Sequence, residues 1–189
     1  MMIVEAEEAY LILGRDKYAS DIKFMCQQTY NLWFDTYYKP QLDKYPTWEI
    51  LYDIYMNLAQ GNSTYKYIKG FVAIESNQIV GYCSMNYNNF VTNSTTNSTT
   101  NSTTNSTTKS TSEKSENTLW LSDVYVWEEF RGKGISKQLI ERVKNVAIET
   151  NEKIYLACED ELIQFYGNKG WSLVNTSRLY NYWNIMEFN

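Results

Sequence analysis

The sequence predicts an α+β protein in which helices cover both faces of a mixed central sheet, an α/β/α arrangement. Segments with apolar residues at helical spacing alternate along the chain with short runs rich in Val, Ile, Tyr and Trp, which favour strands. In the second half, a strand-like run, a glycine-rich turn, an amphipathic helix and a buried-type strand follow one another directly. The 189 residues suffice for a single domain, over 1–189, with a hydrophobic core.

In the N-terminal half, apolar spacing and turn residues predict two helices, a hairpin and a short strand. The helix spacing is clearest for Ile22, Met25 and Cys26, and Pro46 precedes the start of the second helix. The expected elements are a strand over Tyr10–Leu13, a helix over Asp21–Trp33 capped by Ser20, a helix from Thr47 to Ala59, and strands Gly70–Glu75 and Gln78–Met85 joined at Ser76-Asn77.

In the C-terminal half, strands and helices alternate. Ile135, Leu139 and Val143 form the apolar stripe of the longest expected helix. The expected elements are a strand over Leu119–Trp127, a helix over Gly134–Glu149, a strand over Lys153–Cys158, a short helix over Asp160–Asn168 ended by Gly170, and strands Ser172–Thr176 and Tyr182–Phe188.

A tetrapeptide repeat interrupts the chain between two of these strands. Residues 93–108 read NSTT four times, and the polar composition extends over 92–118. Such a stretch buries too little apolar surface to offset the entropy of ordering, so we expect a disordered insertion. A passive insertion and a tether or partner contact are both compatible with this composition.

The sequence contains no histidine, which excludes Ser-His-Asp and Cys-His nucleophile systems and a histidine general base. Cys26, Cys83 and Cys158 lie far apart and form no CxxC pair, so we expect no metal site. The net charge of −5 argues against a general nucleic-acid binder. Apolar runs fall short of the ~20 residues that span a bilayer, and the acidic start differs from a signal peptide. We therefore expect a cytoplasmic protein that binds neither nucleic acid nor membrane.

The glycine-rich turn reads RGKGIS over 131–136, where a strand leads into a helix. Glycines permit positive φ, and a helix N-terminus presents unpaired N–H groups with partial positive charge. This combination predicts an anion site suited to phosphate or pyrophosphate. The turn lacks the GxxxxGK[ST] pattern of a P-loop and the third glycine of a dinucleotide-binding fingerprint. Taken alone, it also fits a simple helix entry.

The stretches LWLSDVYVWEEFRGKGISKQLIERV, KIYLAC and ELIQFYGNKGW resemble, in this order, the GNAT superfamily of acyl-CoA-dependent N-acyltransferases. IVGYCSM upstream resembles the family's third strand, so the resemblance covers 70–172. It implies a mixed sheet of about six to seven strands, splayed at the fourth and fifth strands and flanked by about four helices. It also implies acetyl-CoA as the cosubstrate.

Carried over to this sequence, the resemblance implies two contact regions for acetyl-CoA. The backbone of Val124, Tyr125 and Val126 would bond the pantetheine arm as an added strand does. The pyrophosphate would be wrapped by main-chain amides. The residues implied in this second region are Arg131, Gly132, Lys133, Gly134, Ile135 and Ser136.

Two residues are candidates for proton transfer. The resemblance places Tyr166 where the family often has a tyrosine that protonates the leaving thiolate; a core aromatic is the alternative. With no histidine present, a carboxylate, a tyrosine or relayed water must deprotonate the amine. The strand before the glycine loop resembles that of the spermidine/spermine acetyltransferases, in which a glutamate-aspartate pair stands at this place. Here the two residues are Ser122 and Asp123, so Asp123 is the carboxylate that remains as a candidate base. A strand-edge aspartate pairing a lysine is the alternative.

Three positions depart from the family pattern. Ser136 replaces the usual Gly or Ala, no proline precedes Arg131, and Glu159 stands where many members have an asparagine that contacts the cofactor. An acidic cluster precedes the short helix at Glu159, Asp160 and Glu161. Its charge would attract a cationic acceptor; the alternative is that it only complements the dipole of that helix. Tyr37 and Tyr38 are candidates for lining the acceptor pocket.

The sequence thus predicts an N-acetyltransferase that transfers an acetyl group from acetyl-CoA to a primary amine by direct attack in a ternary complex, with a small-molecule acceptor. The alternatives are a non-catalytic CoA-binding sensor or scaffold and a protein or peptide N-acetyltransferase. Because family members often dimerise through their C-terminal strands, the resemblance also implies a homodimer.

Overall fold

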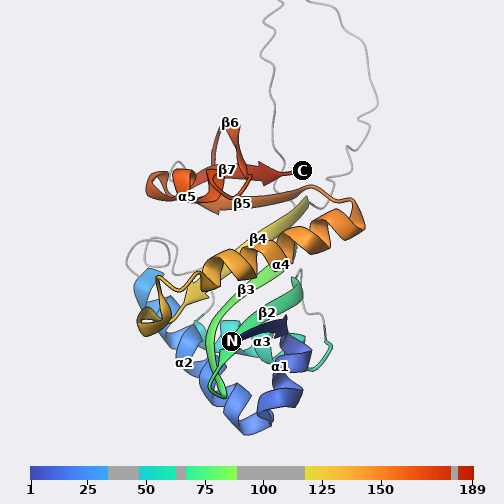
Figure 1. Ribbon diagram of the computed structural model, residues 1–189, viewed down its shortest axis with the longest axis vertical. Coiled ribbons are helices and arrows are strands. Elements are labelled where there is room, and N and C mark those ends of the chain that lie inside the picture. Colours follow the sequence, from blue (N-terminus) through green and yellow to red (C-terminus); the bar gives the residue numbers. More distant parts are fainter. Residues whose placement is uncertain (34–46, 63–66, 89–117, 180–182) are drawn as a thin grey trace, which may run out of the picture.

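The structure, a computed structural model, describes residues 1–33, 47–62, 67–88, 118–179 and 183–189. In these ranges the chain forms a seven-stranded sheet in the order β1-β2-β3-β4-β5-β7-β6. Figure 1 shows β1 to β4 in the lower half of the molecule and β5 to β7 above them. The strands are Met2–Glu5 (β1), Tyr67–Glu75 (β2), Gln78–Asn88 (β3), Thr118–Val126 (β4), Ile154–Cys158 (β5), Ser172–Leu179 (β6) and Trp183–Phe188 (β7).

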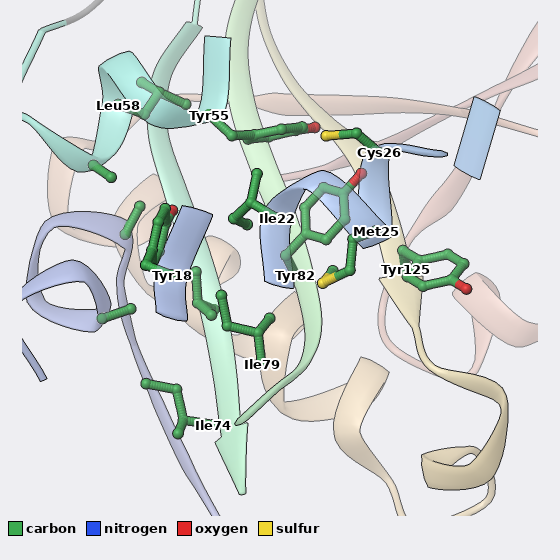
Figure 2. Close-up of a cluster of buried hydrophobic side chains, with 14 of the residues drawn as sticks. Tyr18, Ile22, Met25, Cys26, Tyr55, Leu58, Ile74, Ile79, Tyr82 and Tyr125 are labelled. Atoms are coloured by element: carbon green, nitrogen blue, oxygen red, sulfur yellow. The ribbon is translucent and has the colours of Figure 1, made fainter. Parts of the chain in front are cut away.

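Helices cover the two faces of the sheet. One hydrophobic cluster joins one face to α1, α2 and α3, and a second joins the opposite face to α4 and α5. Figure 1 shows α4 crossing in front of the sheet, and Figure 2 shows part of the first cluster. The helices are Ala6–Leu13 (α1), Arg15–Trp33 (α2), Trp48–Ala59 (α3), Ile135–Thr150 (α4) and Ile163–Gly167 (α5), with 3-10 turns at Glu128–Phe130 and Asp160–Leu162. The predicted α+β class is confirmed.

The neighbouring strands β4 and β5 are parallel, whereas the other described strand pairs are antiparallel. Their pairing is confined to Leu119 with Ile154 and Trp120 with Tyr155, at the beginning of both strands. From Leu121 to Val126, β4 has no register partner on the β5 side in the described sheet. The predicted splay of the fourth and fifth strands is therefore present.

A β-bulge in β4 accompanies this splay. Ser84 of β3 pairs with Ser122, but Tyr82 pairs with Tyr125, so β4 contains one residue more than β3 over this interval. Asp123 lies in the bulge with a φ of 57°, in the left-handed region that aspartate tolerates better than most residues. A bulge bends its strand and increases its twist, which turns the end of β4 away from β5.

Several sequence-based elements are confirmed. The hairpin of β2 and β3 turns at Ser76 and Asn77, both with positive φ. Thr47 precedes α3 as its N-cap, and Gly134 precedes α4. The predicted insertion over 92–118 lies outside the described residues except for Thr118, which begins β4 and pairs with Asn88 at the end of β3.

The prediction of a strand over Tyr10–Leu13 is wrong, because this segment belongs to α1. Its buried face is made by the small residues Ala6 and Ala9, whereas Leu11 is 80% exposed, so the apolar run does not mark the core side. The helix predicted over Asp21–Trp33 is α2, which begins earlier, at Arg15, and buries Tyr18 one turn before Ile22. The short edge strand β1 was not predicted.

Gly81 allows β3 to approach the end of β4 closely. A Cβ atom at this position would lie 2.9 Å from the Tyr125 carbonyl oxygen and 3.3 Å from side-chain atoms of Ile135 and Val126.

We expect Gly81→Ala to lower the free energy of unfolding by about 1–3 kcal/mol, measured by urea denaturation, because the backbone of β4 must move to make room for the added methyl group. Gly167→Ala is the matched control, since a Cβ there meets nothing within 4 Å. Equal stability of the two variants would contradict this close approach.

Candidate active site

The glycine-rich loop over 131–134 connects the 3-10 turn Glu128–Phe130 to α4. Gly132 and Gly134 both have a φ of 76°, a conformation that side chains strongly disfavour. A Cβ atom built on either glycine would have no atom within 4 Å. The loop therefore combines a glycine-specific backbone with open space in front of it.

The first turn of α4 presents backbone donors to this space. In the described part of the chain, the amides of Ile135, Ser136 and Lys137 donate to no backbone carbonyl, and the helix bonding starts with Gln138 N to Gly134 O at 3.2 Å. The first turn contains no acidic residue, and the Gly134 cap supplies no side chain. Unpaired amides at the positive end of a helix dipole favour an anion.

Exposed cations surround the loop although the chain is acidic overall. Arg131 Nε donates a hydrogen bond to the Val126 carbonyl oxygen at 3.1 Å, and its guanidinium lies 6.0 Å from the centre of the Tyr125 ring. Lys133 Nζ lies 4.5 Å from the centre of the Phe130 ring and 4.0 Å from a Glu75 oxygen. Arg131 and Lys133 thus place two positive charges on the loop next to the end of β4.

The predicted pantetheine-binding residues lie on the unpaired part of β4. Tyr125 and Val126 pair with Tyr82 and Gly81 on the β3 side, and the opposite edge of the strand has no register partner in the described sheet. Val124 and Val126 pack against the cluster beneath α4, whereas Tyr125 belongs to the cluster beneath α1 to α3. The side chain of Ile135 is also buried in the α4 cluster, so this residue offers the loop only its amide.

Asp123 receives two hydrogen bonds on one carboxylate oxygen. The Tyr55 hydroxyl donates to Oδ2 at 2.7 Å, and the Ser84 hydroxyl donates to the same atom at 2.8 Å. Tyr55 comes from α3 and Ser84 from β3, so three separate elements meet at the bulge. Burial, and after it the Asp123 charge, raises the pKa of Cys26, Cys83 and Tyr82, which places these three groups within the electrostatic reach of the carboxylate.

Tyr166 lies on α5, against the opposite face of the sheet. It is 8% exposed, with its ring centre 5.0 Å from that of Phe165 and 6.2 Å from that of Trp171. Burial raises the pKa of its phenol, and the neighbouring thiols of Cys158 and Cys83 raise it further. The phenol is therefore held in its protonated form. The Asp123 charge in turn contributes to the raised pKa of Cys83, after burial.

Comparison with known proteins decides the family. The model of the acetyltransferase (GNAT) family matches residues 26–171, which is well over half of the chain. The chain belongs to the GNAT family. It is an acyltransferase of that family, and the resemblance inferred from the glycine loop and its neighbours is confirmed. A search of curated proteins finds no significant match to the sequence.

Solved structures share the GNAT fold along almost the whole chain. A GNAT-family acetyltransferase from Staphylococcus aureus Mu50 is 18% identical, with a TM-score of 0.56 and coverage of 100% of this chain and 98% of that one. PaiA N-acetyltransferase from Thermoplasma acidophilum, in complex with coenzyme A, is 13% identical, with a TM-score of 0.55 and coverage of 99% and 98%. An acyl-CoA N-acyltransferase from Pseudomonas aeruginosa is 14% identical, with a TM-score of 0.54 and coverage of 100% and 97%.

Other residues considered for the site of this GNAT protein lie in different parts of the chain. Tyr37 and Tyr38, expected in the acceptor pocket, lie outside the described residues. In the acidic cluster, Asp160 accepts a hydrogen bond from Asn184 Nδ2 at 2.6 Å. No set of three or more His, Cys, Asp or Glu side chains in the described ranges is grouped to hold a metal ion, and none of the described helices is long and apolar enough to cross a bilayer.

Sequence reasoning missed the partners of Asp123. Tyr55 lies at helical spacing from the apolar residues Leu51 and Leu58, which indicates the buried face of its helix, and its side chain is 2% exposed. Its hydroxyl, however, bonds a carboxylate 68 positions away in the sequence. The periodicity of a helix indicates which of its faces is buried, but not which residue of another element each buried side chain contacts. The sequence therefore indicated only a buried tyrosine on this helix, not its bond to Asp123.

Buried thiols and phenols make the fold of this GNAT protein sensitive to alkaline pH. Burial raises the pKa of Cys26, Cys83, Tyr18, Tyr82 and Tyr166 above the ordinary values of 9.0 for cysteine and 10.0 for tyrosine. Above these values the unfolded chain releases protons that the folded chain keeps, so the unfolded state binds fewer protons and stability falls as pH rises. Below pH 9 this contribution is fully present.

We expect the free energy of unfolding, measured by urea denaturation from pH 7 to 11, to decline from about pH 9 upward. Tyr18→Phe should flatten the decline above pH 10, because it removes one of the buried phenols. A free energy of unfolding that stays constant up to pH 11 would contradict the burial of these groups as neutral species.

Proposed function

We propose that the protein is an N-acetyltransferase that transfers an acetyl group from acetyl-CoA to a primary amine by direct attack in a ternary complex. The observation that carries the proposal is the open glycine loop at the start of α4, placed beside the unpaired edge of β4. A diphosphate and an extended amide-containing arm need these two features side by side. PaiA N-acetyltransferase, which shares the fold, is solved in complex with coenzyme A.

The residues fit such a cosubstrate in three respects. The space that a Cβ at Gly132 or Gly134 would enter is open, so phosphate oxygens can approach the backbone. The unpaired amides of the first α4 turn supply donors, and Arg131, Lys133 and Lys137 supply positive charge. The free edge of β4 over Val124–Val126 can bond the amides of the pantetheine arm in the manner of an added strand. When bound, acetyl-CoA supplies the activated thioester.

Asp123 is the group that we assign to deprotonation of the acceptor. A primary amine is mostly protonated at neutral pH and must lose a proton before its nitrogen can form the new C–N bond. The chain contains no histidine, and Asp123 is a half-buried carboxylate in the bulge where β4 leaves β5. Its carboxylate accepts the ammonium proton, and its negative charge favours a cationic acceptor.

Tyr166 is the group that we assign to protonation of the thiolate that leaves when the C–S bond breaks. The raised pKa keeps its hydroxyl protonated over the neutral range, as a proton donor requires. After donation, the phenolate takes up the proton that the attacking nitrogen loses once the C–N bond has formed. Asp123 releases the ammonium proton to solvent, so the chain ends each cycle unchanged.

The cysteines support direct attack rather than an acyl-enzyme. Cys26, Cys83 and Cys158 are all buried, and burial raises the pKa of each thiol, to about 11 for Cys158. Thiolate is the nucleophilic form of cysteine, and it is scarce at neutral pH in such surroundings. None of the three is therefore suited to carry the acetyl group.

The test of the function is a calorimetric titration with acetyl-CoA, followed by thiol release with a panel of polyamines, amino sugars and peptides. We expect the wild-type chain to bind acetyl-CoA and to release the CoA thiol only when an amine acceptor is present. Gly134→Val should abolish binding, because its side chain fills the open space in front of the loop. Gly14→Val is the matched control, since Gly14 has a φ of 77° and equally open surroundings at the start of α2.

Binding without release across the panel would favour the CoA-binding sensor, and release with peptides alone would favour a peptide acceptor. Absence of acetyl-CoA binding in the wild-type chain would overturn the proposal. Loss of binding in both glycine variants would attribute the effect to folding rather than to the loop, which circular dichroism of the two variants checks.

Tyr166→Phe tests the proton donor. We expect turnover to fall about 10²-fold while the dissociation constant for acetyl-CoA changes little, because the ring still packs on Trp171. Stopped assays of thiol release and calorimetry measure the two quantities. Unchanged turnover would reduce the tyrosine to a packing role. Tyr10→Phe on α1 serves as the control for removal of a tyrosine hydroxyl.

A further inference from the structure

We propose that Tyr55 and Ser84 are positioning residues that hold the Asp123 carboxylate in the orientation needed to take a proton from the amine. This inference rests on the proposed function, and it adds α3 and β3 to the catalytic side of the site. Hereafter the two residues are called the hydroxyl clamp.

The geometry of the hydroxyl clamp restricts the carboxylate. Both hydroxyls donate to Oδ2, at 2.7 Å from Tyr55 and 2.8 Å from Ser84. They approach from different elements, α3 and β3, so rotation about the Cβ–Cγ bond of Asp123 breaks at least one of the two bonds. Hydrogen bonds to a charged acceptor are shorter and stronger than those between neutral groups. The plane of the carboxylate is therefore fixed.

The hydroxyl clamp is itself held rigidly. Tyr55 is 2% exposed, and its ring meets that of Tyr82 edge-on with centres 4.7 Å apart. The Tyr82 hydroxyl lies 3.4 Å from Thr29 Oγ1, and Ser84 is completely buried. Figure 2 shows Tyr55 extending from α3 with its hydroxyl at the end of the cluster where Cys26 lies. A donor locked by packing positions its acceptor more accurately than one on a mobile side chain.

Asp123 needs such support because of its backbone. It sits in the bulge with positive φ, beside a strand edge that has parted from β5, so the regular ladder does not restrain its side chain. The bulge places the carboxylate where β4 opens, and the hydroxyl clamp determines which way it faces. Loss of one hydroxyl leaves the charge in place but removes one of the bonds that orient it, which slows a reaction that depends on alignment.

The decisive experiment is a double-mutant cycle of Tyr55→Phe with Asp123→Asn. Asparagine suits the cycle because it keeps the size of aspartate and tolerates the left-handed backbone. With the amine identified by the release assay, we expect Tyr55→Phe to lower kcat/KM about 10- to 100-fold and to leave the KM for acetyl-CoA unchanged. In the Asp123→Asn background, the same change should have less than about a twofold further effect.

Two further variants separate positioning from folding. Ser84→Ala should reproduce the direction of the Tyr55→Phe effect, because it removes the second donor to Oδ2. Tyr18→Phe removes a buried hydroxyl that has no hydrogen-bond partner in the described residues, from the same hydrophobic cluster. It should leave kcat/KM within about twofold of the wild type. Thermal melting of every variant checks that the fold is retained.

The outcomes distinguish this inference from the proposed function. Equal losses for Tyr55→Phe in both backgrounds, or no loss in the wild-type background, would overturn the hydroxyl clamp while acetyl transfer stands. Full activity of Asp123→Asn would overturn the clamp together with the role of Asp123. A wild-type chain that binds acetyl-CoA but acetylates no amine would refute the proposed function, and the catalytic role of the clamp with it.

Discussion

The parting of β4 from β5 is the constraint on which the rest of the site depends. Two strands that run parallel for two register pairs and then separate leave a row of backbone donors and acceptors without partners on the described sheet. Unpaired backbone groups are costly when buried, so they must meet water or an extended ligand. The bulge at Asp123 helps to produce this separation, and the approach of Gly81 to Tyr125 keeps the other edge of β4 tightly bound to β3.

The glycine loop depends on the same constraint. Four residues separate its start from the end of β4, so the direction of that strand determines where α4 starts and where its unpaired amides point. Ile135, Leu139 and Val143 then fix α4 on the sheet by complete burial of their side chains. A strand that stayed paired with β5 would place the loop beside a closed sheet, with no unpaired strand edge next to it.

Sequence reasoning predicted correctly those features whose structure depends on a few adjacent residues. The hairpin at Ser76 and Asn77, the start of α3 after Thr47 and the loop before α4 each depend on a few adjacent residues, and all were predicted. It failed at α1, where small alanines rather than the larger apolar residues face the core, and at β1, whose four residues are too short to show periodicity. In the candidate site, the loop was found because its residues are contiguous. Tyr55 was not linked to Asp123, because contact between distant elements depends on how they pack.

The two hydrophobic clusters on opposite faces of the sheet have a consequence for how such a protein can change. Tyr55, Tyr82 and Tyr125 belong to the cluster under α1 to α3, whereas Ile135, Leu139 and Tyr166 belong to the cluster under α4 and α5. Substitutions in separate clusters are largely independent in their energetic effects. On the proposed function, the face under α1 to α3, which holds Tyr55 against Asp123, can therefore change while the face under α4 and α5 keeps its packing. A duplicated copy of this chain could acquire a new amine substrate without rebuilding the glycine loop at the start of α4.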